Sequence, residues 1–269
     1  MGIELYKKDL NEFLIYLEAI IDRKSLDSNI LKEAIKYSVF RGGKRLRPIC
    51  TFATANALKK SSQEVFNLAA VIELIHNYSL VHDDMPELDN DNYRRGQLST
   101  HKKFGNGIGL LSGDAIFSLA VETSYNDDLN KSLDDKYKAY GFVFEKAGAT
   151  GMIDGQAFEM NIEPNEDNYY KVIDKKTASL FIASFVGTAL YFGVNNDIDK
   201  LNTFAKLFGE VFQIKDDIAD KDFALMKKDA DIHDILYKKC EKLNKSMEEL
   251  SDTFDIKYFK LLVDFMMSF

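Results

Sequence analysis

Apolar residues recur every three to four positions along most of the chain, the spacing that places them on one face of an α-helix. Alternation of apolar and polar residues over a length typical of strands is missing from the sequence. We therefore predict an all-α protein of about ten helices. The expected helices cover residues 5–21, 30–39, 49–58, 61–84, 108–125, 134–150, 166–192, 199–220, 223–243 and 256–267.

The long helix expected over residues 61–84 carries signals at both of its ends. Ser61 and Glu64 have the spacing of a capping box, in which each side chain satisfies a backbone N–H at the start of a helix. Pro86 cannot continue a helix internally, because it lacks an N–H and its ring clashes with the preceding turn. We predict that the helix ends before Pro86 and that residues 86–107, rich in Asn, Asp, Arg and Gly, form a loop.

Residues 177–196 contain no charged side chain, and this length is sufficient to cross a bilayer. Several Ser, Thr and Asn residues dilute its apolar character. A helix surrounded by other helices shows the same apolar pattern on all sides. We therefore favour a buried helix over a membrane span.

Composition narrows the class of protein further. The chain has 269 residues, of which 46% are hydrophobic, with 35 Lys and Arg against 43 Asp and Glu and a net charge of −8. This length allows one large domain or two small ones. The negative charge argues against a nucleic-acid partner, whose binding depends on clustered Lys and Arg. Cys50 and Cys240 cannot form a disulfide framework, so we expect a cytoplasmic protein, and the N-terminus shows no signal-peptide pattern.

Two acidic clusters, each at the end of a long apolar helix, are the main candidates for chemistry. The first contains Asp83, Asp84 and Asp89, and we expect Pro86 to let Asp89 fold back towards Asp83. In the second, Asp216 and Asp220 are four residues apart and so lie on one face of a helix. Crowded carboxylates repel one another unless a cation lies between them, and oxygen ligands without His or Cys suit Mg²⁺. An acidic helix end is often merely solvated, but two such clusters favour a metal site.

Magnesium held by a few carboxylates usually completes its shell with water and substrate phosphates. Cationic side chains that would bind such phosphates are clustered in three basic segments, 41–48, 94–96 and 175–177. The first surrounds Gly42 and Gly43, whose backbone can approach an anion closely. We predict two anion sites beside the metal site, and a single domain over residues 1–269 in which both acidic clusters face one cavity.

The motifs resemble those of the trans-isoprenyl diphosphate synthases, and among them most closely the bacterial short-chain farnesyl diphosphate synthases. The resemblance rests on GGKRLRP at 42–48, ELIHNYSLVHDDMPELD at 73–89, RRG at 94–96, GQ at 155–156, KT at 176–177 and FQIKDDIAD at 212–220. These segments occur in the order of the family. The resemblance implies the helical isoprenoid-synthase fold around a central cavity, Mg²⁺ as cofactor, isopentenyl and allylic diphosphates as substrates, and a homodimer.

The resemblance also assigns roles by position. Positions that bind the diphosphate of isopentenyl diphosphate match Lys44, Arg47, His76 and Arg95, and those around the allylic diphosphate match Arg94, Lys176, Thr177 and Gln213. The metal positions match Asp83, Asp84, Asp89 and Asp216, with Asp220 added on the same helix face. We expect Asp83, Asp89, Arg94, Lys176 and Asp216 to carry the catalysis. The remaining histidines, His82, His101 and His233, are expected to be loop or core residues.

Tyr78 and Ser79 precede Asp83 by five and four residues on the same helix, or about 6 to 7.5 Å at 1.5 Å per residue. An aromatic side chain at that depth would form the floor that stops chain growth. In similar short-chain enzymes a bulky residue here accompanies C15 or C20 products, so we predict farnesyl diphosphate. The alternatives are that Tyr78 is only a core residue and that the product is geranylgeranyl diphosphate.

The sequence departs from the family pattern at two places. A Gly- and Lys-rich loop normally follows the second acidic cluster, whereas here Asp220 is followed directly by Lys221-Asp222-Phe223. Lys215, Lys221 and Lys227 are candidates to replace the lysine of that loop. Asp154 stands where a glycine is usual before Gly155. These departures leave open a non-catalytic, regulatory prenyltransferase-like subunit, and a terpene cyclase is the alternative among enzymes.

Overall fold

The computed structural model describes residues 3–126, 132–163, 165–220 and 232–268. Within these ranges the chain is helical almost throughout, and its strands are two residues long. The all-α prediction is therefore confirmed. The helices form two compact units. Unit 1 comprises Met1–Leu5, Cys50–Val65 and Asn130–Phe269, and unit 2 comprises Tyr6–Ile49 and Phe66–Leu129.

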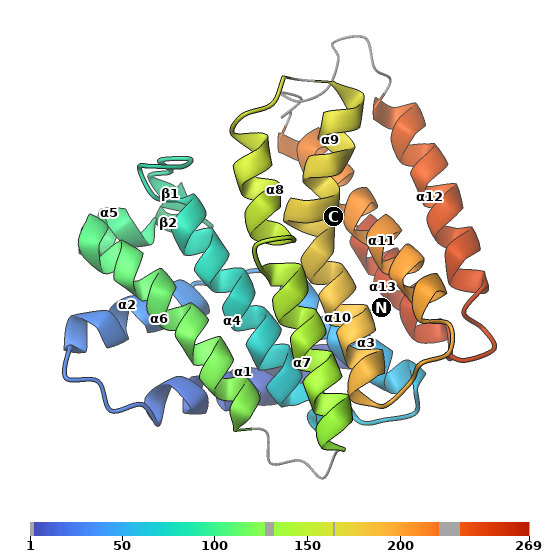
Figure 1. The fold of residues 1–269 in the computed structure, drawn as a ribbon, viewed down its shortest axis with the longest axis horizontal. Helices are drawn as coiled ribbons and strands as arrows, with labels where there is room; N and C mark the ends of the chain where they lie inside the picture. Colours follow the sequence, from blue (N-terminus) through green and yellow to red (C-terminus); the bar gives the residue numbers. More distant parts are fainter. Residues whose placement is uncertain (1–2, 127–131, 164, 221–231, 269) are drawn as a thin grey trace. The chain divides into compact units, whose positions relative to one another are not determined.

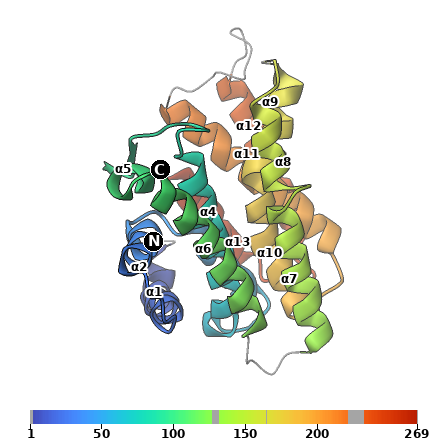
Figure 2. The same cartoon turned by 60° about the vertical axis from the view of Figure 1, so that its left-hand side comes forward.

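Unit 2 is built around the apolar helix α4, which is buried on nearly all sides. Helix α4 lies side by side with α6 in both views (teal and green in Figures 1 and 2). The elements of this unit are α1 (Lys7–Asp22), α2 (Asn29–Phe40), the first turn of α3 (Leu46–Ala57), α4 (Phe66–Asp83), β1 (Tyr93–Arg94), β2 (Gln97–Leu98), α5 (Thr100–Phe104) and α6 (Asn106–Tyr125).

The contact between α4 and α6 depends on a small residue. A Cβ on Gly113 would lie 2.1 Å from His82 Nε2, so only glycine lets the His82 ring approach α6 this closely. His82 Nε2 lies 3.2 Å from the carbonyl oxygen of Leu110. Towards the other end of the pair, Asn67 Nδ2 donates to the Thr123 carbonyl oxygen at 2.9 Å. The packing fixes the C-terminal end of α4, from which the first acidic cluster continues.

Unit 1 contains the remaining elements. These are most of the 3₁₀ helix η1 (Ile3–Tyr6), the rest of α3, the 3₁₀ helix η2 (Ser62–Val65), α7 (Leu133–Ala147), α8 (Met152–Glu159), α9 (Glu166–Val172), the π-helix η3 (Ile173–Ala178), α10 (Ser179–Tyr191), α11 (Ile198–Asp220), α12 (Ile232–Glu248) and α13 (Lys257–Met267). Helix α10 packs against α7 and α11, and α11 packs against α12 (Figure 1).

The core of unit 1 is a cluster of phenylalanine rings from α10, α11 and α13. Phe181, Phe185, Phe204, Phe208 and Phe259 are all fully buried. Their rings pack mostly edge to face, the arrangement that aromatic quadrupoles favour, with centroids 5.3 Å apart for Phe181 and Phe208. Helix α10 is buried along almost its whole length, which confirms the prediction of a buried helix. No helix in the described part of the chain is both long and apolar enough to span a membrane.

Three differences from the predicted elements concern the site. The loop expected over 86–107 contains the hairpin of β1 and β2 and the short helix α5, and α8 was not predicted. The single helix expected over 166–192 is divided into α9, the π-helix η3 and α10. The expected start of a helix at residue 223 lies outside the described residues, and that helix is described from Ile232 as α12.

Candidate functional site

The first acidic cluster forms a tight turn at the end of α4. Helix α4 ends at Asp83, and the backbone N–H of Asp89 donates to the Asp83 carbonyl oxygen at 3.0 Å. Asn90, with a φ of 52°, donates to the Met85 carbonyl oxygen at 3.0 Å and completes the reversal. The prediction that Asp89 folds back towards Asp83 is therefore confirmed.

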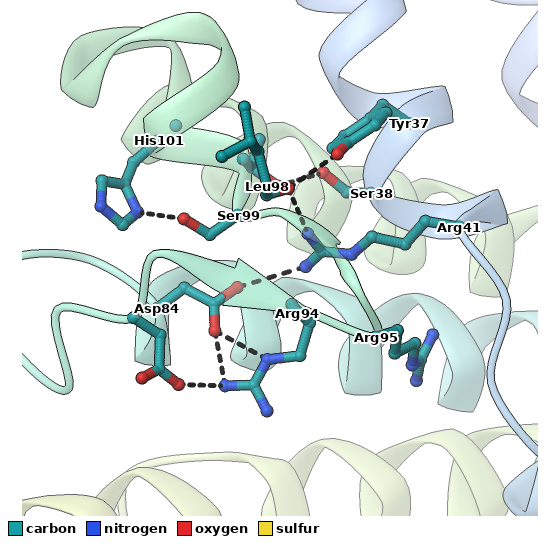
Figure 3. A network of polar contacts seen from close by, with 12 residues as sticks. Tyr37, Ser38, Arg41, Asp84, Arg94, Arg95, Leu98, Ser99 and His101 are labelled. Carbon is teal, nitrogen blue, oxygen red and sulfur yellow. Dashed lines mark hydrogen bonds and ion pairs between the residues drawn. The ribbon is translucent and has the colours of Figure 1, made fainter.

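Asp84 has a different environment from its neighbours in the cluster. Its carboxylate is fully buried, with Oδ2 accepting from Arg41 Nη2 at 3.2 Å and Oδ1 accepting from Arg94 Nε at 2.8 Å (Figure 3). A buried carboxylate is tolerated when it is paired in this way. Both oxygens are thus in contact with guanidinium groups, and a metal ion at Asp84 would have to displace one of them.

The hairpin of β1 and β2 separates two arginines that are adjacent in sequence. Its central residues, Arg95 and Gly96, have φ values of 55° and 74°, and two positive φ angles are what a type I′ turn requires. Arg94, on β1, points to Asp84 (Figure 3). Arg95 instead donates a hydrogen bond to the Gly42 carbonyl oxygen. One short hairpin therefore directs one arginine to the acidic turn and the other to the Gly-Gly segment.

Glycine at position 43 leaves room for the Arg95 guanidinium and allows a positive φ angle. A Cβ there would lie 2.4 Å from Arg95 Cζ, and the φ of Gly43 is 109°. The Arg95 guanidinium therefore lies directly against the backbone of the Gly-Gly segment. Of the four cations around this segment, two are held by buried carboxylates, Arg41 by Asp84 and Arg45 by Glu73 at 2.5 Å. Their positions in the sequence do not distinguish these two structural cations from the others.

Arg47 and His76 form the next pair in unit 2. Arg47 Nη1 donates to His76 Nε2 at 3.2 Å, which leaves the proton of the neutral ring on Nδ1. Burial, followed by the positive charges of Arg47, Arg95, Arg45 and Arg94, holds the pKa of His76 well below its ordinary value. His76 is therefore a neutral acceptor that orients Arg47, and not an additional cation.

Several positively charged side chains lie near Arg95. Partial burial, together with the guanidinium groups of Arg45, Arg41 and Arg94, lowers the pKa of Arg95 to about 10. Glu73 is the carboxylate that acts in the opposite direction. Arg95 remains charged at neutral pH, and the repulsion would be relieved by an anion. This part of unit 2 therefore has the electrostatics of an anion site.

In unit 1, a chain of hydrogen bonds connects η3 with the second acidic cluster. Thr177 Oγ1 donates to Gln213 Oε1 at 2.8 Å, and Gln213 Nε2 donates to Asp217 Oδ1 at 2.7 Å. Tyr169 Oη donates to Asp217 Oδ2 at 2.6 Å. Asp217 is therefore held by protein groups through both carboxylate oxygens, as Asp84 is in the first acidic cluster. The structure thus brings together Thr177 and Gln213, as the family resemblance implies.

Asp216 and Asp220 lie on the last turns of α11, where Asp216 is half-buried and Asp220 is exposed. Lys176 Nζ donates to Glu159 Oε2 at 2.5 Å, so this predicted ligand of a diphosphate has a carboxylate partner in α8. Within the described ranges, no three Asp, Glu, His or Cys side chains are arranged to hold a metal ion by themselves. An all-oxygen donor set fits Mg²⁺, which takes one or two carboxylates and completes its shell with phosphates and water.

Two glycines allow neighbouring helices to pack closely against the π-helix η3. A Cβ on Gly155 would lie 2.6 Å from the backbone N of Lys176, and one on Gly209 would lie 2.6 Å from Ala178 Cα. Helices α8 and α11 therefore approach the backbone of η3 without intervening side chains. Asp154, the departure from the family pattern, accepts a hydrogen bond from Lys175. No sequence signal used above would have found the π-helix, a form often associated with functional sites.

Tyr78 is 7% exposed, and its ring packs edge to face against Phe117 with centroids 5.0 Å apart. Burial, with a smaller effect of the Asp83 charge, raises the pKa of Tyr78 to about 12, and its buried Oη has no hydrogen-bond partner among the described residues. Ser79 Oγ donates to the His76 carbonyl oxygen at 2.9 Å. Tyr78 is thus held in place by packing.

Three lysines, Lys215, Lys221 and Lys227, are the candidates to replace the lysine of the missing loop. Lys215 Nζ donates to the carbonyl oxygens of Met266 and Met267 at 3.0 and 2.8 Å, so it is engaged with the C-terminal end of α13. Lys221 and Lys227 lie outside the described residues.

Of the histidines, His101 is buried, as expected of a core residue, and its Nδ1 lies 3.1 Å from Ser99 Oγ.

Comparison with known proteins identifies the family of this chain. The model of the polyprenyl synthetase family matches residues 28–246. The chain is similar to a farnesyl diphosphate synthase of Micrococcus luteus, with 34% identity over 76% of this chain and 70% of that protein. It is also similar to a chloroplastic geranylgeranyl pyrophosphate synthase of Capsicum annuum, with 32% identity over 77% of this chain and 60% of that protein.

Comparison with solved structures identifies the same group of proteins. The crystal structure of a geranyltransferase from Legionella pneumophila superposes with a TM-score of 0.88 and 25% sequence identity, over 99% of this chain and 96% of that one. The family match covers most of the chain and includes both acidic clusters and every basic segment described above. The chain therefore belongs to the polyprenyl synthetase family of prenyltransferases.

Proposed function

We propose that this chain condenses isopentenyl diphosphate with dimethylallyl or geranyl diphosphate and releases farnesyl diphosphate. The observation that supports this most directly is the cationic group of unit 2. There Arg47 is oriented by a neutral His76, and Arg95 lies on the backbone of Gly42 and Gly43. The same hairpin directs Arg94 to the acidic turn. Two adjacent sites for anionic groups are what a reaction between two diphosphates requires.

In this proposal the diphosphate of isopentenyl diphosphate binds to Arg47 and Arg95, with Lys44 and His76 beside them. Guanidinium groups suit this task because their planar donor edge matches phosphate oxygens. The like charges that lower the pKa of Arg95 are compensated when the dianionic or trianionic group binds. The Gly-Gly segment contributes by letting the Arg95 guanidinium lie against the backbone.

The allylic diphosphate binds in this proposal to Arg94, Lys176, Thr177 and Gln213. Of the five carboxylates expected to hold Mg²⁺, we assign Asp83, Asp89, Asp216 and Asp220 to the metal, whereas Asp84 would first have to release a guanidinium group. When bound, Mg²⁺ supplies positive charge to the leaving diphosphate as a Lewis acid. Lys176 would turn from Glu159 to the diphosphate, because the stronger negative charge of the ligand competes for its ammonium group.

The reaction needs no nucleophilic side chain. The C–O bond of the allylic diphosphate breaks and its electron pair leaves with the diphosphate. The π electrons of isopentenyl diphosphate form the new C–C bond, and the adjacent carbon gives up a proton to the released diphosphate. The role of Arg94 is to hold preorganised positive charge where negative charge develops, and Lys176 adds its charge once it has turned from Glu159. This role is consistent with the proposed sites, in which cations and carboxylates predominate and Thr177, Gln213 and His76 are neutral hydrogen-bonding groups.

A product assay tests the proposal. Purified protein is incubated with Mg²⁺, isopentenyl diphosphate and either dimethylallyl or geranyl diphosphate, and both diphosphate release and product length are measured. We expect farnesyl diphosphate from both allylic substrates, and no product after removal of Mg²⁺ with a chelator or in Asp83→Ala. Binding of both diphosphates without turnover would instead indicate a non-catalytic subunit, and diphosphate release without isopentenyl diphosphate would indicate a cyclase.

Product length should depend on the ring of Tyr78. In Tyr78→Ala the floor is removed, so we expect a shift from farnesyl to geranylgeranyl and longer diphosphates, measured by chromatography of the dephosphorylated products. Tyr78→Phe is the matched control: it keeps the ring and deletes a buried hydroxyl that has no partner among the described residues, so product length should stay the same. Identical products from Tyr78→Ala and the native enzyme would contradict the floor. Predominantly C20 product from the native enzyme would favour a geranylgeranyl diphosphate synthase.

The homodimer rests on the family resemblance and the cytoplasmic location on the cysteine content, and both stay predictions. The oligomeric state is open to a direct measurement by analytical ultracentrifugation.

A further inference from the structure

Arg41 forms part of an ion-pair cluster whose two ends have different surroundings. Its side chain is 2% exposed and its Nη2 donates to Asp84 Oδ2, while Asp84 itself has no exposed surface. Asp84 Oδ1 accepts from Arg94, whose side chain is 27% exposed. The cluster, whose contacts are drawn in Figure 3, therefore runs from a buried arginine, through a buried carboxylate, to a partly exposed arginine.

The contacts of Arg94 leave one edge of its guanidinium open. Its Nε and Nη2 both donate to Asp84 Oδ1, and Nη2 also donates to Asp91 Oδ2 at 3.1 Å. Nη1 has no hydrogen-bond partner in the described part of the chain, and Figure 3 shows the remaining nitrogen pointing away from Asp84. A ligand can approach Arg94 from this edge.

Arg41 also connects the elements around this cluster. It caps the C-terminal end of α2, and its Nη1 donates to the Leu98 carbonyl oxygen at 3.4 Å, at the end of β2. The same oxygen accepts from Tyr37 Oη at 2.7 Å. Arg41 thus joins the end of α4, through Asp84, to the hairpin that carries Arg94.

We propose that Arg41 is a positioning residue that acts through Asp84 to hold the open edge of Arg94 towards the allylic diphosphate. The inference rests on the proposed function. With Arg41 present, Asp84 Oδ2 is satisfied and Arg94 binds Oδ1 alone. Without it, a buried and ionised oxygen is left without a donor, which is costly. Arg94 then rotates to bind both oxygens of Asp84, and its open edge leaves the substrate.

The expected kinetic effect is specific to one substrate. In Arg41→Met, kcat/KM for the allylic diphosphate should fall about tenfold to a hundredfold, the size of effect that a small misplacement of a catalytic group produces. The KM for isopentenyl diphosphate should stay unchanged, because Arg47 and Arg95 do not depend on Asp84. Arg41→Lys keeps the charge but has no second donor edge for Leu98, so it should show the same pattern with a smaller loss.

A double-mutant cycle separates positioning from a purely structural role. In Asp84→Asn the carboxylate that transmits the effect is neutral, so adding Arg41→Met should change the allylic kcat/KM far less than it does in the native chain. Arg45→Met is the matched control: Arg45 is held in an equally buried pair with Glu73, and none of its hydrogen bonds goes to Asp84 or Arg94. Its loss should lower the unfolding temperature without raising the allylic KM.

The outcomes are distinguishable from failure of the proposed function. If the native enzyme does not turn over the two diphosphates, the proposed function fails. If the native enzyme is active, equal allylic kcat/KM in the native enzyme and folded Arg41→Met overturns the inference, as do additive effects of the two substitutions. If Arg41→Met does not fold, Arg41→Lys decides, and an unchanged allylic kcat/KM in that variant overturns the inference.

Discussion

Single arginines that are neighbours in this sequence differ in what they contact. Arg94 and Arg95 contact different partners because Arg94 ends β1 whereas Arg95 is the first central residue of the type I′ turn, and Arg41 and Arg45 are bound by buried carboxylates. Charge counted along the chain therefore overstates the number of cations available to a ligand. The contacts, and not the composition, decide which arginines can bind a diphosphate.

The close contact between Gly43 and Arg95 predicts different effects for two adjacent glycines. Gly42 and Gly43 have similar positive φ values, 98° and 109°, so alanine strains the backbone at either position. Only a Cβ at Gly43 meets the Arg95 guanidinium, since nothing lies within 4 Å of a Cβ at Gly42. A charge-assisted contact is worth about 1.5 to 3 kcal/mol, so Gly43→Ala should raise the KM for isopentenyl diphosphate by about tenfold or more.

Gly42→Ala is the control for this pair, with a comparable loss of thermal stability and a smaller change in that KM. Steady-state kinetics with geranyl diphosphate held at saturation measures both variants. Equal KM values in the two would show that Arg95 does not bind isopentenyl diphosphate through this contact.

The lowered pKa of His76 predicts a dependence of stability on pH. The folded state keeps the ring neutral, while in the unfolded state it takes up a proton near its ordinary pKa of about 6.5. Stability is therefore present above that pH and is lost as the pH falls below it, by at most about 1.4 kcal/mol per pH unit. In His76→Gln this contribution is absent.

Urea unfolding between pH 8 and pH 5 compares the two proteins. The free energy of unfolding should decrease more steeply towards pH 5 in the native chain than in His76→Gln. Parallel curves would mean that His76 takes up its proton equally in the folded and unfolded states.

At the level of secondary structure, the π-helix η3 depends on what packs against it. Gly155 and Gly209 let α8 and α11 approach its backbone, and the segment carries Lys176 and Thr177. A regular α-helix through these residues would place Lys176 and Thr177 at different angles, since a π-turn adds a residue to the turn. The geometry of the predicted allylic ligands in unit 1 is thus determined by helix packing.

Two glycine substitutions test this packing. A Cβ at Gly209 meets the Ala178 backbone, so Gly209→Ala should destabilise the protein by about 1 to 3 kcal/mol, the usual range for overpacking. Gly141→Ala in α7 is the control, because a Cβ there meets nothing within 4 Å. This change should stabilise the helix by about 0.5 to 1 kcal/mol. Urea unfolding measures both, and a neutral Gly209→Ala would show that η3 can move away from α11.

At the level of the whole molecule, the proposal requires both acidic clusters to act on one allylic diphosphate, although one belongs to unit 2 and the other to unit 1. Asp83→Asn and Asp216→Asn should each lower kcat by about a hundredfold to a thousandfold, the effect of losing one electrostatic contact to the leaving group. Because groups that act as a unit are not additive, the double variant should lose little more than either single one.

Asp199→Asn, an exposed carboxylate in the first turn of α11, is the control and should leave kcat unchanged. Losses that multiply in the double variant would indicate that the two clusters contribute independently.

The sequence predicted much of the fold because helix signals are local. The stripe of α1, the capping box, in which the Ser61 N–H donates to Glu64 Oε1 at 3.1 Å, and the helix end before Pro86 all depend on residues a few positions apart. The hairpin, α5 and α8 were missed because they are short and carry no periodic pattern. The division of residues 166–192 was missed because a π-turn reflects packing and not propensity.

For the candidate site, the sequence by itself identified the charged groups, which are two acidic clusters and three basic segments, together with the family and the turn of Asp89 towards Asp83. The tertiary structure alone decided how these groups are paired and buried. In the structure Arg41 and Arg45 form buried ion pairs, and Asp84 is the partner of two guanidinium groups. His76 is a neutral acceptor, and Lys215 donates to backbone carbonyl oxygens at the end of α13. The physical reason is that ionisation and pairing depend on burial and on partners far away along the chain, which no spacing in the sequence records.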